Sequence, residues 1–396
     1  MRGELVQAEF HRVPTWLGRA VVLAYGKAGR EGRFRNDPWS RFGLGGACDV
    51  ARAAKQTQFG PDTMRNEPMS RSRRGALRAV VCAVALVNVP AVGAQPKSGE
   101  RRVGFLAPGS ASMRMYEGFR RGMSELGYVD GRDHRVQWCY AYGEYGRLAG
   151  LASELALAKV DIVIAGTTLS VQAARQAMAT TPIVMVAVPD PVGEGFAASL
   201  SRPGGNITGL SNIVTEVSVK HFELLRAAVP RLSRLAVLIN PLNPSDSLIL
   251  EQVQGAAYAL GVKVLPVEAS TETQIDAGFA AMARAQSEAL VVAEDAYFDV
   301  HHERIIRSAL RSRLPTIYSN REMTEAGGLM SYGQELTEHY RRAANYVDKI
   351  WKGAKPGNLP IEQPTVLELV INRGTAAALG LAIPKELELR ADQFVG

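Results

Sequence analysis

The fold is decided by residues 161–190, which read DIVIAGTTLSVQAARQAMATTPIVMVAVPD. Two short apolar runs, residues 161–166 and 182–188, enclose a segment with apolar residues at helical spacing, residues 169–178. An apolar run without in/out alternation is typical of a strand that is buried on both faces of a parallel sheet. This stretch therefore predicts a β-α-β unit.

The same alternation of strand and helix continues on both sides of this unit. Upstream, it predicts strands at 102–107 and 135–142 and helices at 113–126 and 145–159. A Gly- and Pro-rich stretch, residues 190–211, interrupts the alternation. Downstream, strands are predicted at 235–240, 262–267, 289–293, 316–319, 328–332 and 366–371, and helices at 217–229 and 337–351. The predicted fold class is α/β, with two doubly wound parallel-sheet lobes joined by a hinge.

The interruption sets the expected lobe boundaries. We expect a first lobe at residues 101–214 and a second at 215–354, with residues 355–391 returning in part to the first. Three chain crossings between the lobes favour a hinge over a flexible tether. Two lobes on a hinge are typical of proteins that close around a ligand.

Residues 64–94 predict a signal peptide. Several arginines precede an apolar run of about nine residues, 79–87, and small residues at 91–94 offer a cleavage site before Gln95. The run is far shorter than the roughly 20 residues that span a bilayer, so we expect a periplasmic location and no anchor. Arg73 and Arg74 leave both the general secretory and the twin-arginine routes open. Residues 1–63 are either an upstream extension that is not native or a disordered segment.

The positive charge of the chain lies in this leader. Residues 1–94 contain 15 Lys and Arg against 7 Asp and Glu, whereas residues 95–396 contain 31 against 32. The near-neutral body excludes a nucleic-acid-binding role based on charge. Cys139 is the one cysteine of the body and cannot form an internal disulfide.

Polar and aromatic side chains follow the predicted strands, where parallel sheets bind ligands. Thr167 and Thr168 open a helix and either hold a carboxylate or cap that helix. Asp295 is a candidate acceptor for an ammonium group or a turn former. The twelve expected ligand-binding residues are Ser110, Tyr142, Thr167, Thr168, Asp190, Asn240, Asn243, Ser245, Asp295, Tyr297, Ser319 and Tyr332.

The three tyrosines in this set either stack on an aromatic or apolar ligand or pack in the core. Asn243 and Ser245 stand at the start of a helix in the second lobe, where they repeat the arrangement of Thr167 and Thr168.

Catalytic signatures are absent from the sequence. It contains no phosphate-binding loop, no G-x-S-x-G elbow and no H-E-x-x-H pair. The polar cluster at residues 295–303 predicts a helix that begins near His301 and is capped by Asp299, rather than a metal site. We therefore expect no catalytic residue, no metal and no cofactor.

Several motifs in order resemble the ABC-transporter substrate-binding proteins of the tryptophan/tyrosine-binding type. They are RVGFLAPGS, GFRRGMSELGYVDGRD, DIVIAGTTLSVQAARQA, TPIVMVAVPDPVGEGFAASLSRPGGNITGLS, LAVLINPLNPS and REMTEAGGLMSYG, within residues 101–391. The resemblance implies a type I periplasmic-binding fold with the ligand between the lobes.

The resemblance also implies roles for individual loops. It assigns a ligand carboxylate to Thr167 and Thr168 and to residues 240–245, and a ligand amine to the Asp295 region. The loop Ala-Glu-Asp-Ala-Tyr at 293–297 departs from the Thr-Asp-Asn type of the members that bind aromatic amino acids. The resemblance therefore implies the fold for this chain, and the ligand stays open between an amino-acid-like and another aromatic or carboxylate-bearing molecule.

The expected function is that of an exported, monomeric solute-binding protein that delivers a small ligand to an ABC permease. Two alternatives stay open. One is an exported α/β enzyme with Asp190 or Asp295 as general base, and the other is a sensory binding protein that docks on a membrane receptor.

Overall fold

The computed structural model describes residues 100–363 and 365–396, all of which belong to one compact unit. The predicted signal peptide and the segment before it lie outside the described residues. None of the helices in the described part is long and apolar enough to cross a bilayer.

The first lobe is built on a five-stranded parallel sheet with the order β2-β1-β3-β4-β5. Strands β1, β3 and β4 are almost wholly buried, as the continuous apolar runs predict, and β2 is an edge strand. Its strands are β1 (Arg101–Ala107), β2 (His134–Tyr140), β3 (Ile162–Ala165), β4 (Ile183–Val188) and β5 (Ile207–Ser211).

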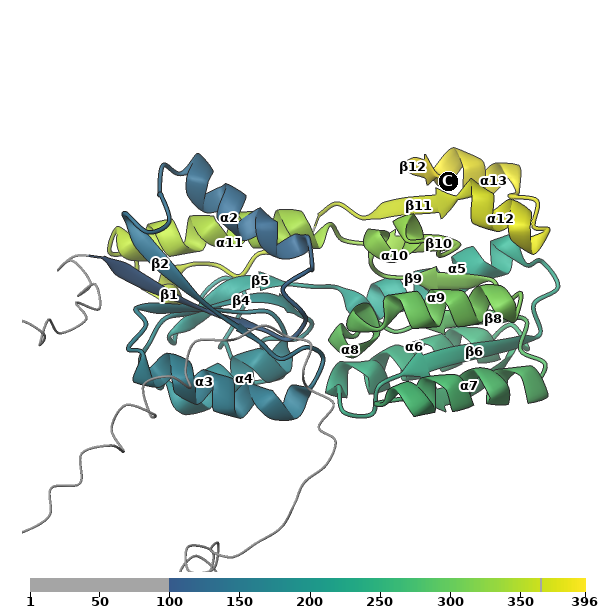
Figure 1. Ribbon diagram of the computed structural model, residues 1–396, viewed down its shortest axis with the longest axis horizontal. Coiled ribbons are helices and arrows are strands. Elements are labelled where there is room, and N and C mark those ends of the chain that lie inside the picture. Colours follow the sequence, from purple (N-terminus) through teal and green to yellow (C-terminus); the bar gives the residue numbers. More distant parts are fainter. Residues whose placement is uncertain (1–99, 364) are drawn as a thin grey trace, which may run out of the picture. The chain divides into compact units, whose positions relative to one another are not determined.

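Helices cover both faces of this sheet, as Figure 1 shows. One face packs against α3 (Leu148–Leu157), which follows the 3-10 turn η1 (Tyr145–Arg147), and against α4 (Thr168–Ala177). The other packs against α2 (Met115–Glu125) and α11 (Leu336–Trp351). Residues 336–351 therefore belong to the first lobe.

The contact between α2 and α11 depends on two glycines. A Cβ at Gly118 or Gly122 would collide with the backbone carbonyl of Thr337 or Arg341 on α11. Gly127 ends the first helix in the left-handed conformation (φ +86°), as its position after the apolar pattern predicts. Glycine spacing thus sets how closely these two helices approach.

The second lobe is built on a seven-stranded sheet with the order β12-β11-β10-β9-β8-β6-β7. All its neighbours are parallel except β10 and β11, which pair antiparallel. Its strands are β6 (Arg234–Ile239), β7 (Lys263–Glu268), β8 (Ala289–Val292), β9 (Thr316–Tyr318), β10 (Met330–Gly333), β11 (Glu368–Asn372) and β12 (Gln393–Val395).

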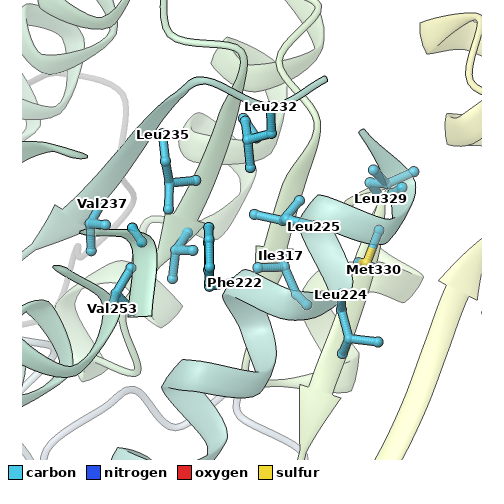
Figure 2. Packing of buried hydrophobic residues seen from close by; sticks show 14 of the residues in the cluster. Phe222, Leu224, Leu225, Leu232, Leu235, Val237, Val253, Ile317, Leu329 and Met330 are labelled. Carbon is cyan, nitrogen blue, oxygen red and sulfur yellow. The ribbon is translucent and has the colours of Figure 1, made fainter. Parts of the chain in front are cut away.

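Two apolar clusters, one on each face of this sheet, form the core of the second lobe. Figure 2 shows one of them, in which Phe222 and Leu225 of α5 point toward Leu235 of β6 and Ile317 of β9. The helices of this half are α5 (Val214–Ala228), α6 (Pro244–Tyr258), α7 (Glu272–Arg284), α8 (Ala296–Val300), α9 (His302–Arg311), α10 (Arg321–Glu325), α12 (Arg373–Leu379) and α13 (Lys385–Arg390). The 3-10 turn η2 (Pro356–Asn358) contacts the first lobe at β5 and Gly204.

The expected lobe boundaries are wrong at the carboxyl-terminal end. Residues 336–351 cover the first sheet, and residues 368–372 and 393–395 add two strands to the second sheet. The expected partial return of 355–391 to the first lobe holds for residues 357–362, which bond to the segment around β5, whereas the strand at 368–372 belongs to the second sheet. The chain crosses between the sheets three times, at 211–214, 333–336 and 362–368, which is the expected number of crossings.

Two further features differ from the prediction. Strand β5 lies inside the Gly- and Pro-rich stretch, where Gly209 has φ +133° and its Cα faces the backbone of Met185 on β4. A side chain would collide there, so glycine permits the pairing and at the same time hides the strand from pattern analysis. Helix α13 and strand β12 were not predicted because both are very short.

Candidate ligand-binding site

A cleft of about 410 Å³ is lined by residues of both lobes. The first lobe contributes the loop after β1 and the start of α2, and the second contributes α8, α10 and the turns before them. Its lining residues include Ser110, Met113, Arg114, Asp299, Asn320 and Glu322. Of the twelve expected residues, Ser110 lines this cleft.

Asp295 caps helix α8 and links the two lobes. Its Oδ1 accepts hydrogen bonds from Asn240 Nδ2 (3.0 Å) and from two backbone N–H groups in the first turn of α8. Its Oδ2 accepts from Asn243 Nδ2 (3.0 Å) and from the Tyr145 hydroxyl of the first lobe (2.6 Å). Five donors thus occupy a carboxylate that is 2% exposed, so it has no free lone pair for a ligand ammonium or for a proton transfer. The expected amine-binding role of Asp295 is corrected on this ground.

Glu294, the residue before Asp295, has a different environment. Its side chain is partly accessible although protein surrounds it, which is the combination expected of a group that lines an internal cleft. Burial raises the pKa of Glu294 from 4.5 to about 7, and a hydrogen bond from the Asn212 side chain lowers it in part. The carboxyl therefore keeps acceptor sites for a ligand.

Asp299 stands one turn further along α8 and lines the cleft. Burial raises the pKa of Asp299 well above its usual value, and the neighbouring Glu294 raises it further. Its Oδ1 accepts from Asn320 Nδ2 at 2.7 Å. The predicted cap of the next helix is wrong, because α9 begins after His301 without a side-chain cap and the Asp299 carboxyl is directed to Asn320.

Three aromatic side chains pack together in the core of the first lobe. The Tyr340 ring packs edge-on against Tyr116 (5.1 Å) and is stacked on Phe105 (5.5 Å). The charges of Glu294 and Asp299 both raise the pKa of the Tyr340 hydroxyl, and the charge of Asp299 also raises the pKa of Tyr116. Acidic groups of one lobe thus lie close to phenol groups of the other.

Three further side chains bury hydrogen-bonding atoms that have no partner among the described residues. They are Thr168 Oγ1, Ser319 Oγ and both amide atoms of Gln334. Each stands one to three residues after the carboxyl end of a strand. Because a buried polar atom without a partner costs about 1–3 kcal/mol, these atoms are suited to a partner that arrives with the ligand.

Thr167 and Asn243 act as helix caps in the two lobes. Thr167 Oγ1 accepts from the backbone N–H of Ser170 (3.3 Å) at the start of α4. Asn243 Oδ1 accepts from the backbone N–H of Ser245 (3.2 Å) at the start of α6. At the start of α4, Thr168 is 3% exposed and its hydroxyl has no hydrogen-bond partner among the described residues.

Asn240 and Asp246 support the same corner of the second lobe. The backbone N–H of Asn240 donates to Asp246 Oδ2 (2.7 Å), and its amide donates to Asp295. Burial raises the pKa of Asp246 well above its usual value. Asn240 therefore positions the β8–α8 turn.

The three tyrosines have different surroundings. Tyr142 is 46% exposed, has φ +56° and lies under the Arg147 guanidinium (5.4 Å). Tyr297 packs on His301 (4.3 Å) within one of the second-lobe core clusters. Tyr332 packs against the other cluster. Core packing is the role that the structure gives to the last two.

Asp190 stabilises a turn, because its carboxylate accepts from the backbone N–H of Gly193 (2.8 Å) on the surface. In the described part of the chain, no group of three or more His, Cys, Asp or Glu side chains is arranged to hold a metal ion. Of the two expected general bases, Asp295 has no free lone pair in this geometry, whereas Asp190 keeps acceptor sites on an exposed turn.

Sequence analysis missed Glu294, Asp299, Asn212, Asn320 and Gln334. Four of them stand within two residues of the end of a buried strand, the same signal that selected their neighbours. At the β8 end, the pair Glu-Asp gives two adjacent carboxyls, and the pattern does not tell which one caps the helix.

Comparison with known proteins follows this geometry. The family model described as ABC transporter substrate binding protein matches residues 104–395. The chain belongs to this family. Members of the family bind solutes, in agreement with a cleft that both lobes line.

Individual relatives are distant. The chain is 24% identical over 265 residues to a tyrosine-binding protein of Clostridioides difficile (strain R20291), covering 67% of this chain and 76% of the relative. A conserved domain protein from Vibrio cholerae has a TM-score of 0.69 at 26% identity, covering 75% of this chain and 100% of that chain. An ABC domain in complex with L-Trp from Streptococcus pneumonia has a TM-score of 0.69 at 24% identity, with the same coverage. These likenesses confirm the predicted two-lobed periplasmic-binding fold.

Proposed function

We propose that the protein is an exported, periplasmic solute receptor that captures a small amino-acid-like ligand between its lobes and presents it to an ABC permease. Family membership supports solute binding. The observation that carries the proposal is the cleft lined by both lobes, in which Asp299 leaves acceptor sites unfilled. The leader at residues 64–94 supports export, and we propose that the mature protein acts as a monomer.

Glu294 is the proposed acceptor for the ligand ammonium. It occupies the end of β8, and its partners are an amide and no ion pair among the described residues. The chain is similar to a tyrosine-binding protein and to a domain in complex with L-Trp, and both of these ligands are α-amino acids. An ammonium group that pairs with Glu294 would compensate the charge that burial disfavours.

The amino terminus of α4 is the proposed site for the ligand carboxylate. Thr167 caps this helix with its own hydroxyl, and Thr168 presents a buried hydroxyl without a partner. A helix amino terminus adds backbone N–H groups and a favourable dipole for an anion. The two helix ends, α4 and α8, come from different lobes, so a ligand that contacts both favours closure.

The test is a thermal-shift and calorimetric screen of the purified protein against the twenty amino acids, aliphatic amines and sugars. A ligand that binds the native state raises the melting temperature. We expect α-amino acids or amines to raise it and sugars to leave it unchanged. Recovery of the ligand unaltered after denaturation would distinguish capture from turnover, and a response to sugars alone would contradict the proposal.

A further inference from the structure

Four carboxyls, two of them buried and two partly accessible, lie around the β8–α8 turn without a cationic partner among the described residues. Among residues 100–363 and 365–396, none of them forms an ion pair with Lys, Arg or His, although ion pairs are frequent elsewhere in the chain. The four are Asp246, Glu294, Asp295 and Asp299. Burying a carboxylate without a counter-charge is unfavourable, so the cluster requires protons or a cation.

Two of the four are held by the protein itself. Asp295 accepts five hydrogen bonds, and Asp246 accepts from the backbone of Asn240 in the first turn of α6. Both positions are 1–2% exposed. These two carboxyls therefore stabilise the turn, and of their oxygens only Asp246 Oδ1 has no partner among the described residues.

The other two have acceptor capacity to spare. Glu294 accepts from the Asn212 side chain and Asp299 from Asn320, whereas a carboxylate can accept about four hydrogen bonds. Asp299 lines the cleft together with Glu322 and Glu325. Arg114, the one arginine in that lining, is already paired with Glu325. The lining is therefore acidic on the side of the second lobe.

We propose that the ligand carries two positively charged groups, one held by Glu294 and the other by Asp299, so that the site takes a basic amino acid or a diamine in preference to an aromatic amino acid. This inference rests on the proposed function and specifies its ligand. An aromatic ring in the same place would cover Asp299 without supplying a donor, and burying an unpaired carboxyl is costly. A second cation instead forms a charge-assisted hydrogen bond in a poorly solvated cleft.

Proton release follows from this arrangement. Burial disfavours the charged forms of Glu294 and Asp299, and a bound cation favours them, so each cation lowers the pKa of the carboxyl that holds it. Dicationic ligands should thus bind more tightly as the pH rises from 6 to 8. The titratable and polar groups that face the two carboxyls are Tyr116, Asn212, Asp246, Asp295, His302, Asn320, Glu322 and Tyr340.

The experiment is calorimetric titration of the protein at pH 8 with L-lysine, L-arginine and 1,4-diaminobutane, against L-tryptophan and L-tyrosine. We expect the dicationic probes to bind at least about ten-fold more tightly than the aromatic ones. Comparison of the amino acids with the diamine shows whether the α-carboxylate is also recognised. Titration of the wild type in two buffers of different ionisation enthalpy measures proton release without any variant.

Asp299→Asn should weaken the dicationic probes at least about ten-fold and leave L-tryptophan within about two-fold. Glu251→Gln on the exposed face of α6 is the matched control for loss of one negative charge. Tighter binding of L-tryptophan or L-tyrosine than of the dicationic probes, or equal weakening of both classes in Asp299→Asn, overturns this inference and leaves solute capture standing. Absence of binding by every amino acid and amine would overturn both.

Discussion

One carboxylate, that of Asp295, caps a helix, orients two asparagines and receives a hydroxyl from the other lobe. Asp295→Ala removes the cap and leaves the donors of Asn240, Asn243 and Tyr145 unpaired. We expect the free energy of unfolding to fall by about 3 kcal/mol or more, from one lost cap and at least one buried unpaired donor. Urea denaturation measures this loss.

Asp190→Ala is the control for Asp295→Ala, because Asp190 accepts one hydrogen bond in an exposed turn. The free energy of unfolding of Asp190→Ala should fall by less than about 1 kcal/mol. Equal losses in the two variants would remove the structural role assigned to Asp295.

Glu294→Gln separates stability from binding. The folded pKa of Glu294 is about 7 against 4.5 in a free side chain, so the folded state binds more protons than the unfolded state between these values. Its contribution to stability is present below pH 4.5 and is lost as the pH rises through 7. At pH 8 the variant should be more stable than the wild type by up to about 3 kcal/mol.

The same variant should bind an amine ligand at least about ten-fold more weakly, because it lacks the charge. Melting curves from pH 4.5 to 8, combined with titration of the ligand, measure both effects. A variant that loses stability at pH 8 would show that the Glu294 carboxylate is compensated within the protein.

His221 affects the pH dependence of stability in the direction opposite to Glu294. Burial lowers the pKa of His221 to about 4, and its Nε2 contacts the backbone carbonyl of Tyr332 (2.6 Å). Between pH 6.5 and 4 the unfolded state is protonated there and the folded state is not, so stability falls on acidification. Relative to His221→Gln, the wild type should lose about 3 kcal/mol over this range. Chemical denaturation at pH 7, 5.5 and 4 measures this loss. A stability that falls equally with pH in the wild type and in His221→Gln would contradict the prediction.

Sequence alone located the carboxyl edge of each sheet but not the roles of the side chains along it. Thr167 and Asn243 could be assigned as caps or ligand contacts, and the structure shows the caps. Asp295, expected as the acceptor for an ammonium group or as a turn former, caps α8, because helix capping depends on the backbone direction after β8, which residue type does not encode.

At the scale of elements, the glycines of α2 determine how closely this helix packs against α11 in the first lobe. Gly118→Ala or Gly122→Ala would place a methyl group against the α11 backbone, which cannot yield as a flexible side chain can. We expect a loss of about 2–3 kcal/mol for each variant from overpacking. Thermal denaturation in the absence of ligand measures it.

Gly150→Ala in α3 is the matched control, since a Cβ there meets no atom within 4 Å. It should raise stability by up to about 1 kcal/mol through helix propensity alone. If Gly118→Ala and Gly150→Ala shift the melting temperature in the same direction, the close helix contact is not needed.

Strand and helix positions were predictable because apolar periodicity reports burial directly. The sheet that a helix covers was not, since α11 would show the same apolar stripe against either sheet. Strand β11 likewise has the composition of a parallel strand, and its antiparallel pairing with β10 depends on the chain returning from the first lobe.

At the scale of the whole molecule, the two lobes touch at Gly143. A Cβ on this residue would lie 2.8 Å from Tyr297 Cα, and its φ is +80°. Gly143→Ala should therefore weaken ligand binding by at least about five-fold, as it adds a collision that exists only where the lobes meet. Equilibrium dialysis with the ligand identified in the screen measures the change.

Gly131→Ala separates this collision from backbone strain. Gly131 has a similar φ (+77°) and open space around its Cα. Both variants should lose about 1 kcal/mol of stability from the left-handed conformation. Only Gly143→Ala should lose affinity for the ligand. Equal affinities of the two variants would show that the lobe contact at Gly143 does not contribute to ligand binding.

The threefold crossing of the chain also governs the order of assembly during synthesis. The sheet begun at residues 101–107 must wait for the helix at 336–351 to cover it, and the second sheet must wait for residues 393–395. Such sequence-distant contacts slow folding and leave apolar surface exposed in the nascent chain. Neither lobe can be completed as an independent early unit, so an unfinished chain stays in a form that a chaperone or a translocation machine can still hold open.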